Sequence, residues 1–135
     1  MTVLLMAVRI GLVGAGFFDP DPLSGYPPGT PPTALNPSLH RILHDLFSTP
    51  VFTALPAVCF VLARRFAQAH MRSWAIYSAV SGGLMAALFV LTSVAFNQGT
   101  VLTTVGGLLQ RLTLATGFAW MAVLGLWGIR SRHSA

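Results

Sequence analysis

The sequence predicts an all-α fold: a membrane-embedded bundle of four transmembrane helices with a proline-rich outer loop between the first two. Four long apolar runs alternate with short polar segments, and each run is long enough to cross about 30 Å of hydrocarbon. Apolar side chains make up 54% of the chain and charged ones only 8%, whereas a soluble domain has roughly a quarter charged residues. Arginines lie at the ends of the apolar runs, as topology signals do.

The first helix is predicted near residues 1–18, which just suffices to cross the hydrocarbon. Gly11 and Ala15 give it a face of small residues on which another helix can pack closely. Arg9 is an intramembrane charge that costs at least about 2.5 kcal/mol near mid-bilayer, so we expect it to face the bundle or a wet cavity. A cleaved signal peptide is a less favoured alternative, because Arg9 interrupts its apolar core and a basic n-region is missing.

Residues 19–36 are predicted to form a rigid outer loop, because their proline density rules out a helix or a central strand. Asn36 and Pro37 have the order of an N-cap and a first helical residue, so the second helix is predicted near residues 37–66. Two prolines inside this span predict bends. The first turns carry a group of polar residues: His40, Arg41, His44 and Asp45.

The connection at residues 64–72 carries three arginines and is therefore predicted to be cytoplasmic. The third helix is predicted near residues 73–96 and the fourth near 101–129. The fourth is longer than the hydrocarbon requires, so we expect it to bend at Gly106-Gly107. Four spans leave both termini cytoplasmic, in a multi-pass protein of the cell membrane whose residues 1–135 form a single transmembrane domain.

Several short motifs follow one another along the chain. They are Phe18, Asp21-Pro22 with Gly25-x-Pro27-Pro28-Gly29, Leu43-His44, Phe60-x-x-Ala63-Arg64-Arg65-Phe66, Trp74-Ala75-x-Tyr77-Ser78 and Gln110-Arg111. In their order and spacing, the chain resembles the bacterial multi-pass membrane proteins grouped as domain of unknown function 998. Those proteins are typically longer, and this sequence resembles their four C-terminal spans. The resemblance implies that the chain needs a partner, either the missing N-terminal helices or a second copy in a homo-oligomer.

A polar cluster is predicted at the outer boundary of the membrane. Counting about 20 residues, one hydrocarbon thickness, from the cytoplasmic arginines places His44-Asp45 and Gln110-Arg111 at the same depth. We expect a ligand-binding or structural cluster there, made of Asp21, His40, His44, Asp45, Gln110 and Arg111. Since Asp45 already has Arg41 one helical turn away, Asp21 is predicted to pair with Arg111 and to roof any pocket.

Two hypotheses of function from different classes follow. One is an outer-face, metal-assisted hydrolase, in which His40, His44 and Asp21 hold a zinc ion that activates water. The favoured one is a non-enzymatic membrane component, or a small-ligand binder with a pocket at the outer face. The histidine spacing is common by chance, and the chain has no glutamate to act as a general base.

The favoured interpretation assigns no catalytic residue, metal or cofactor. Haem is not favoured, because His70 and His133 are predicted on the opposite side of the membrane from His40 and His44. Nucleic acid is excluded as a partner, since the arginines form no basic stripe. The expected surroundings are the lipid bilayer.

Overall fold

The computed structural model describes residues 1–22, 27, 29–30, 37–97 and 101–133. The elements in these residues are all helical: α1 (Thr2–Phe17), α2 (Leu39–Gln68), α3 (Arg72–Asn97), the short 3₁₀ helix η1 (Val101–Val105) and α4 (Gly106–His133). The prediction of an all-α fold with four helices is therefore confirmed, whereas the prediction that all four cross the membrane is supported for the three longer ones. Most of the predicted outer loop lies outside the described residues.

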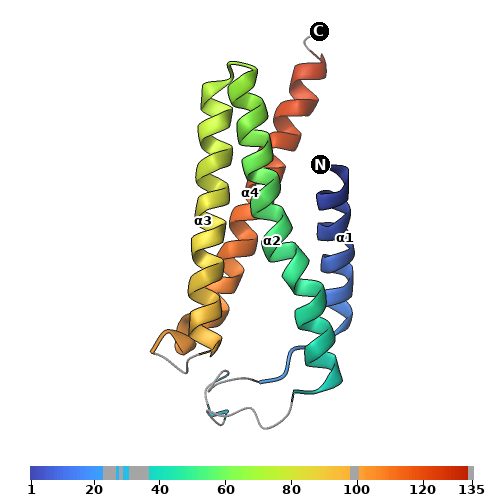
Figure 1. Ribbon diagram of the computed structural model, residues 1–135, viewed down its shortest axis with the longest axis vertical. Helices are drawn as coiled ribbons and strands as arrows, with labels where there is room; N and C mark the ends of the chain where they lie inside the picture. The colour runs from blue at the N-terminus through green and yellow to red at the C-terminus, as the bar shows by residue number, and fades with distance from the viewer. Residues whose placement is uncertain (23–26, 28, 31–36, 98–100, 134–135) are drawn as a thin grey trace.

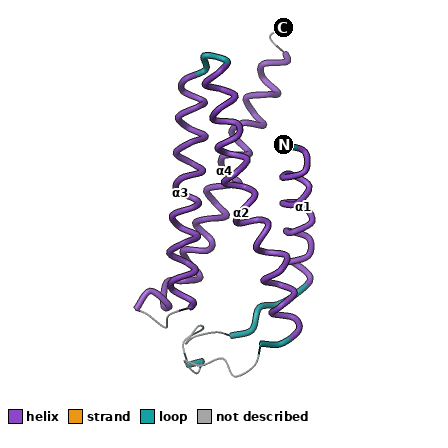
Figure 2. The backbone as a smooth tube through the Cα atoms, in the orientation of Figure 1, coloured by secondary structure: helices purple, strands orange, loops and turns teal. Residues whose placement is uncertain are grey.

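Each described α-helix packs mainly on its neighbours in the sequence, and α4 passes behind α2 and α3 in the view of Figure 1. α1 contacts only α2, and α4 packs mainly on α3 with a smaller contact to α2. α2 and α3 lie side by side at their connecting turn and diverge toward the opposite end (Figure 1). At that opposite end, the loop residues that follow α1 approach those that precede α2 (Figure 2); we name it the loop end.

Small residues allow α1 to approach α2 closely. A Cβ added to Gly11 would lie 2.6 Å from the carbonyl oxygen of Phe47, and one added to Gly14 would overlap the Phe47 ring. Gly14, one position before the predicted Ala15, thus makes the second close approach. Arg9 does not face the bundle. Its side chain is exposed beside a shallow groove that Phe47 helps to line, because no other described element covers this part of α1.

The buried core takes residues from all four α-helices, including Val8 of α1, and its least accessible side chains lie on α2, α3 and α4. Leu55 and Cys59 of α2, Met85 of α3 and Trp120 of α4 are almost inaccessible to solvent. Gly117 brings α4 close to both other helices, since a Cβ there would lie 2.5 Å from Leu55 and 2.8 Å from Met85. The densest packing is therefore in the middle of the molecule, away from the loop end.

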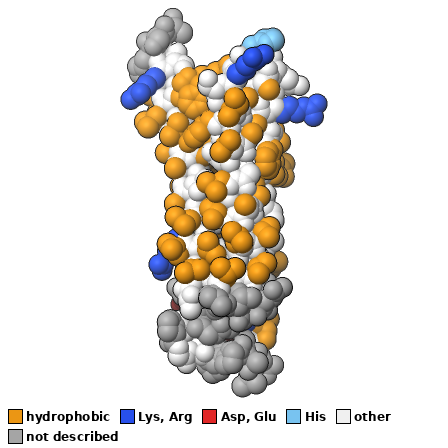
Figure 3. All heavy atoms as spheres, turned by 90° about the vertical axis from the view of Figure 1, so that its left-hand side faces the viewer, with side chains coloured by type: hydrophobic (Ala, Val, Ile, Leu, Met, Phe, Trp, Pro, Cys, Tyr) orange, Lys and Arg blue, Asp and Glu red, His pale blue; other side chains and the backbone are white. Residues whose placement is uncertain are grey.

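Three of the helices are long and apolar enough to cross a membrane, over Leu39–Gln68, Arg72–Phe96 and Gly106–Ser131, while Thr2–Phe17 is a shorter apolar helix. Large hydrophobic side chains also cover the outside of the molecule, as the middle band in Figure 3 shows. A soluble protein rarely exposes so extensive an apolar surface. The chain is therefore a multi-pass membrane protein, and the predicted span of α1 stays a prediction.

The predicted fourth helix has two parts. Residues Val101–Val105 form the 3₁₀ helix η1, and the α-helical part begins at Gly106, where the sequence predicts a bend. A Cβ on Gly106 would lie 2.9 Å from the ring of Phe96. The missing side chain thus lets the start of α4 lie against the end of α3.

Candidate functional site

His44 of α2 joins the start of its helix to the end of α1. Its Nδ1 lies 2.7 Å from the carbonyl oxygen of Phe18 and 3.1 Å from that of Ala15. Both partners are acceptors, so Nδ1 carries the ring proton and donates it, which leaves Nε2 as the acceptor of the neutral ring. The last carbonyls of a helix lack donors within that helix. His44 therefore caps the C-terminal end of α1.

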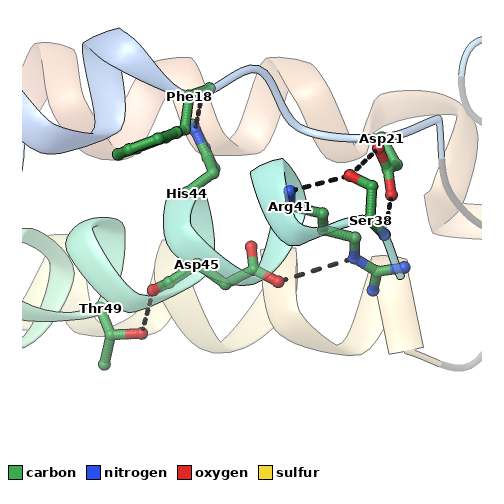
Figure 4. Close-up of polar contacts among 7 residues, drawn as sticks. All are labelled: Phe18, Asp21, Ser38, Arg41, His44, Asp45 and Thr49. Atoms are coloured by element: carbon green, nitrogen blue, oxygen red, sulfur yellow. Dashed lines mark hydrogen bonds and ion pairs between the residues drawn. The ribbon is translucent and has the colours of Figure 1, made fainter. Parts of the chain in front are cut away.

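Asp21 fixes the start of α2 through Ser38, the N-cap residue of this helix (Figure 4). Its Oδ2 accepts the backbone N–H of Ser38 at 2.7 Å, and its Oδ1 accepts the Ser38 hydroxyl at 2.7 Å. The Ser38 hydroxyl oxygen in turn accepts the backbone N–H of Arg41 at 3.2 Å. The cap thus lies two residues after the predicted Asn36, which is outside the described residues.

These hydrogen bonds stabilise the ionised form of Asp21. The hydroxyl of Ser38, then its backbone N–H, and more weakly the charge of Arg41 hold the pKa of the Asp21 carboxyl below its usual value of 3.8. Asp21 is therefore negatively charged at neutral pH.

Asp21 does not form the predicted ion pair with Arg111. All three aspartates and Arg111 belong to the described part of the chain, and none of these carboxylates lies within ion-pair distance of the Arg111 guanidinium. The reason is competition, because Ser38 offers Asp21 two donors at once where α2 begins. Arg111 is exposed instead.

Arg41 and Asp45 form the expected pair one helical turn apart. The distance from Arg41 Nε to Asp45 Oδ2 is 3.6 Å, and 63% of the Asp45 side chain is exposed. A long, exposed contact of this kind contributes little to stability. Asp45 therefore keeps much of its capacity to attract another cation.

A pocket of about 360 Å³, which we name the polar pocket, is lined mainly by residues of α2 and α3 near the loop end. Residues from the loop after α1, from α2, α3 and α4 line it: Pro20, Asp21, Arg41, His44, Asp45, Ser48, Thr49, Phe52, Phe89, Thr92, Ser93, Phe96 and Gln110. Phe52 of α2 and Phe89 of α3 stack with their ring centroids 5.1 Å apart and their planes at 6°. The polar pocket thus combines charged groups, hydroxyls and aromatic rings.

A family model described as "Protein of unknown function (DUF998)" matches residues 1–127. The chain belongs to the DUF998 family. This confirms the resemblance seen in the sequence motifs. Searches of the curated proteins and of the solved structures returned no match. The chemistry of this DUF998 protein must therefore be argued from its own residues.

The predicted polar cluster is divided in this DUF998 protein. Four of its six residues line the polar pocket, namely Asp21, His44, Asp45 and Gln110. The other two do not line it. His40 packs edge-on against the ring of Phe18, with the centroids 5.7 Å apart, and Arg111 is exposed on α4.

Sequence reasoning missed the hydroxyl and aromatic walls of the polar pocket. On α3, Phe89, Thr92, Ser93 and Phe96 follow the i, i+3, i+4, i+7 spacing that places residues on one helix face. On α2, Asp45, Ser48, Thr49 and Phe52 repeat this spacing. This spacing, repeated on two helices, could have revealed the pocket walls in the sequence. It was missed because both segments were interpreted only by the length of their apolar runs.

The three candidate zinc ligands are engaged elsewhere. His44 uses Nδ1 for the carbonyls of α1, His40 packs on Phe18, and Asp21 binds Ser38 through both oxygens. Within the described ranges, no group of three or more His, Cys, Asp or Glu side chains is placed to share a metal ion. This arrangement gives the hydrolase hypothesis no support.

Proposed function

We propose that this DUF998 protein is a non-enzymatic membrane protein that binds a small amphiphilic ligand in the polar pocket. The observation that carries the proposal is the composition of the pocket, which has a charged rim around Asp21 and Asp45 and an aromatic wall around Phe52 and Phe89. Its volume of about 360 Å³ falls in the range of roughly 300–1,000 Å³ usual for small-molecule sites. A ligand with one polar and one apolar end matches both surfaces.

The side chains most suited to catalysis support a binding role. His44 and Asp21 each hold a helix end in place through short hydrogen bonds. A general base needs freedom to accept a proton from a substrate. Asp21 is committed to Ser38 through both oxygens and the Nδ1 of His44 to the backbone, so of these two side chains only His44, through Nε2, keeps that capacity. We therefore assign Asp21 and the Nδ1 of His44 to the shape of the pocket.

The distribution of charge supports an outward-facing pocket in a protein whose four helices all cross the membrane. Most of the arginine and histidine side chains visible in Figure 3 gather at the end where α2 and α3 are connected. Arginines in short loops favour the cytoplasmic side. On this topology both termini are cytoplasmic, and the loop end with the polar pocket faces out.

A binding assay with a pocket-filling variant tests the proposal. Thr92→Phe places a ring in the pocket, and Val90→Phe, on an exposed position of the same helix, is the matched control. The unfolding temperature of detergent-purified protein is measured with short alkyl amines, carboxylates and sugars. At least one class is expected to raise it in the wild type and in Val90→Phe, and to leave Thr92→Phe unchanged. If no class stabilises the wild type, the binding role is excluded.

A further inference from the structure

Three of the four hydroxyl side chains that line the polar pocket have already used their protons. Thr49, Thr92 and Ser93 each donate to the backbone carbonyl four residues earlier in the same helix, at 2.7, 2.8 and 2.9 Å. A hydroxyl has one proton to donate and further capacity to accept. These three hydroxyls therefore offer oxygen acceptors to a ligand, while Ser48 and the Gln110 amide keep donors in the lining.

The rim of the pocket has the same bias. His44 donates its Nδ1 proton to the carbonyls of α1, and Asp21 and Asp45 are acceptors when ionised. Arg41 is the single cation among the lining residues, and its guanidinium lies beside Asp45 and acts electrostatically on Asp21. Two carboxylates against one guanidinium leave the rim with a net negative charge.

The apolar side of the pocket also favours a cation. The stacked rings of Phe52 and Phe89 lie beside Phe96 in the lining, and aromatic faces attract positive charge. Pro56 lies inside α2 and has no N–H, so the carbonyl of Phe52 loses its helical donor. One more acceptor is thus left on a residue of the pocket wall.

We propose that the polar pocket selects a primary ammonium group carried on an apolar body. This inference rests on the proposed function of the pocket as a ligand site. A primary ammonium group supplies three N–H donors and one positive charge, which complements the acceptors of the walls and the charge of the rim. A quaternary ammonium group has the charge without the donors. An anionic group is disfavoured because the carboxylates of Asp21 and Asp45 repel it.

The test uses three probes of similar shape, namely 2-phenylethylamine, its N,N,N-trimethyl derivative and 3-phenylpropionate. Their affinities are measured by calorimetry at pH 7 on the full chain in phosphatidylcholine nanodiscs. The primary amine is expected to bind at least tenfold more tightly than either analogue, and Thr92→Phe is expected to abolish its binding. Equal affinity for the amine and its trimethyl derivative, or tighter binding of the carboxylate, overturns the proposal.

Two carboxylate variants provide a matched pair. Asp45→Asn removes a charge from the rim and is expected to weaken amine binding about tenfold while strengthening binding of the carboxylate probe, because Arg41 is then unopposed. Asp19→Asn removes an exposed charge from a residue outside the pocket lining and is expected to leave both affinities unchanged. If the two variants have the same effect, the rim charge does not select the ligand.

The source of the amine is distinguished by changing the lipid. In phosphatidylethanolamine nanodiscs, an aminophospholipid headgroup that occupies the pocket competes with 2-phenylethylamine and lowers its apparent affinity. If the natural ligand is instead a free amine, 2-phenylethylamine is expected to bind with equal affinity in the two lipids. Either result, lowered or equal affinity, supports ammonium selection. If only the carboxylate probe binds, and Thr92→Phe abolishes that binding, ammonium selection is overturned while the binding role of the pocket stands. If none of the three probes binds, both ammonium selection and the binding role are rejected.

Discussion

The indole Nε1 of Trp120 donates a hydrogen bond to the hydroxyl of Ser78 across 3.1 Å, between α4 and α3. Trp120 is 2% exposed and Ser78 is fully buried. A buried indole N–H needs an acceptor, because the lost hydration is otherwise uncompensated. This bond therefore fixes how α4 is rotated against α3, and so which of its residues reach the polar pocket.

Removing the acceptor is expected to destabilise the protein. Ser78→Ala leaves the Trp120 N–H buried and unpaired, which costs about 1–3 kcal/mol. Ser73→Ala, at an exposed position of α3, is the control and is expected to change the free energy of unfolding by less than about 0.5 kcal/mol. Denaturant titration in detergent, followed by tryptophan fluorescence, measures both. Equal free energies of unfolding for the two variants would show that the hydrogen bond between Trp120 and Ser78 does not stabilise the protein.

Two adjacent glycines of α3 are expected to respond differently to the same substitution. A Cβ on Gly82 would lie 2.9 Å from the Cβ of Cys59 and 3.3 Å from the carbonyl oxygen of Pro56, whereas one on Gly83 meets no atom within 4 Å. Gly82→Ala therefore forces α2 and α3 apart at a cost of about 1–3 kcal/mol. Gly83→Ala is expected to be neutral or slightly stabilising, because alanine has the higher helix propensity. Thermal unfolding that ranked them in the opposite order would contradict this packing.

The hydrogen-bonding role of His44 at the end of α1 can be separated from the bulk of its side chain by two substitutions. His44→Leu leaves the carbonyls of Ala15 and Phe18 without their donor and is expected to cost about 1–3 kcal/mol. His44→Asn keeps an N–H near the position of Nδ1 and is expected to retain much of the stability. Hydrogen exchange of the last turn of α1 should increase in the leucine variant only. Equal protection in both variants would mean that the cap is not needed.

Acid is expected to weaken the link between Asp21 and Ser38. The pKa of Asp21 is lowered in the folded protein, so its contribution to stability is complete above its unfolded value and is lost as the pH falls through the folded value. The difference in unfolding temperature between the wild type and Asp21→Asn should therefore be constant above about pH 5 and shrink below pH 3.8. A difference that persisted at the lowest pH would argue against an ionic link. Asp19→Asn is the control at every pH.

The helices were predictable from the sequence because apolar length and the positions of arginine are local properties. Counting residues also gave a shared depth for His44, Asp45 and Gln110, and all three line the polar pocket. The depth of a residue in the membrane, however, does not determine the side of the helix on which its side chain lies. Gln110 and Arg111 differ by one position and hence by about 100°, so Gln110 lines the pocket while Arg111 is exposed.

The partner of Asp21 was not predictable, because it depends on the path of the loop in space. The sequence identified an unsatisfied cation, Arg111, but a carboxylate is also satisfied by the donors of a nearby helix start. Ser38 offers two such donors. The stacking of Phe52 on Phe89 was hidden for a related reason, since both rings are part of apolar runs that the bilayer alone explains.

The packing of each helix on its neighbours in the sequence has a consequence for biogenesis. Because the described helices pack mainly on their neighbours in the chain, each helix that emerges during synthesis finds its main partner already in the membrane. Contacts between neighbours in sequence also close short loops, which favours rapid assembly. The exception is the fit of Gly117 in α4 against Leu55 in α2, which joins helices that are not neighbours in the sequence and can form only after α4 has been inserted. The polar pocket, to which α4 contributes Gln110, is thus expected to be complete only once α4 is in place.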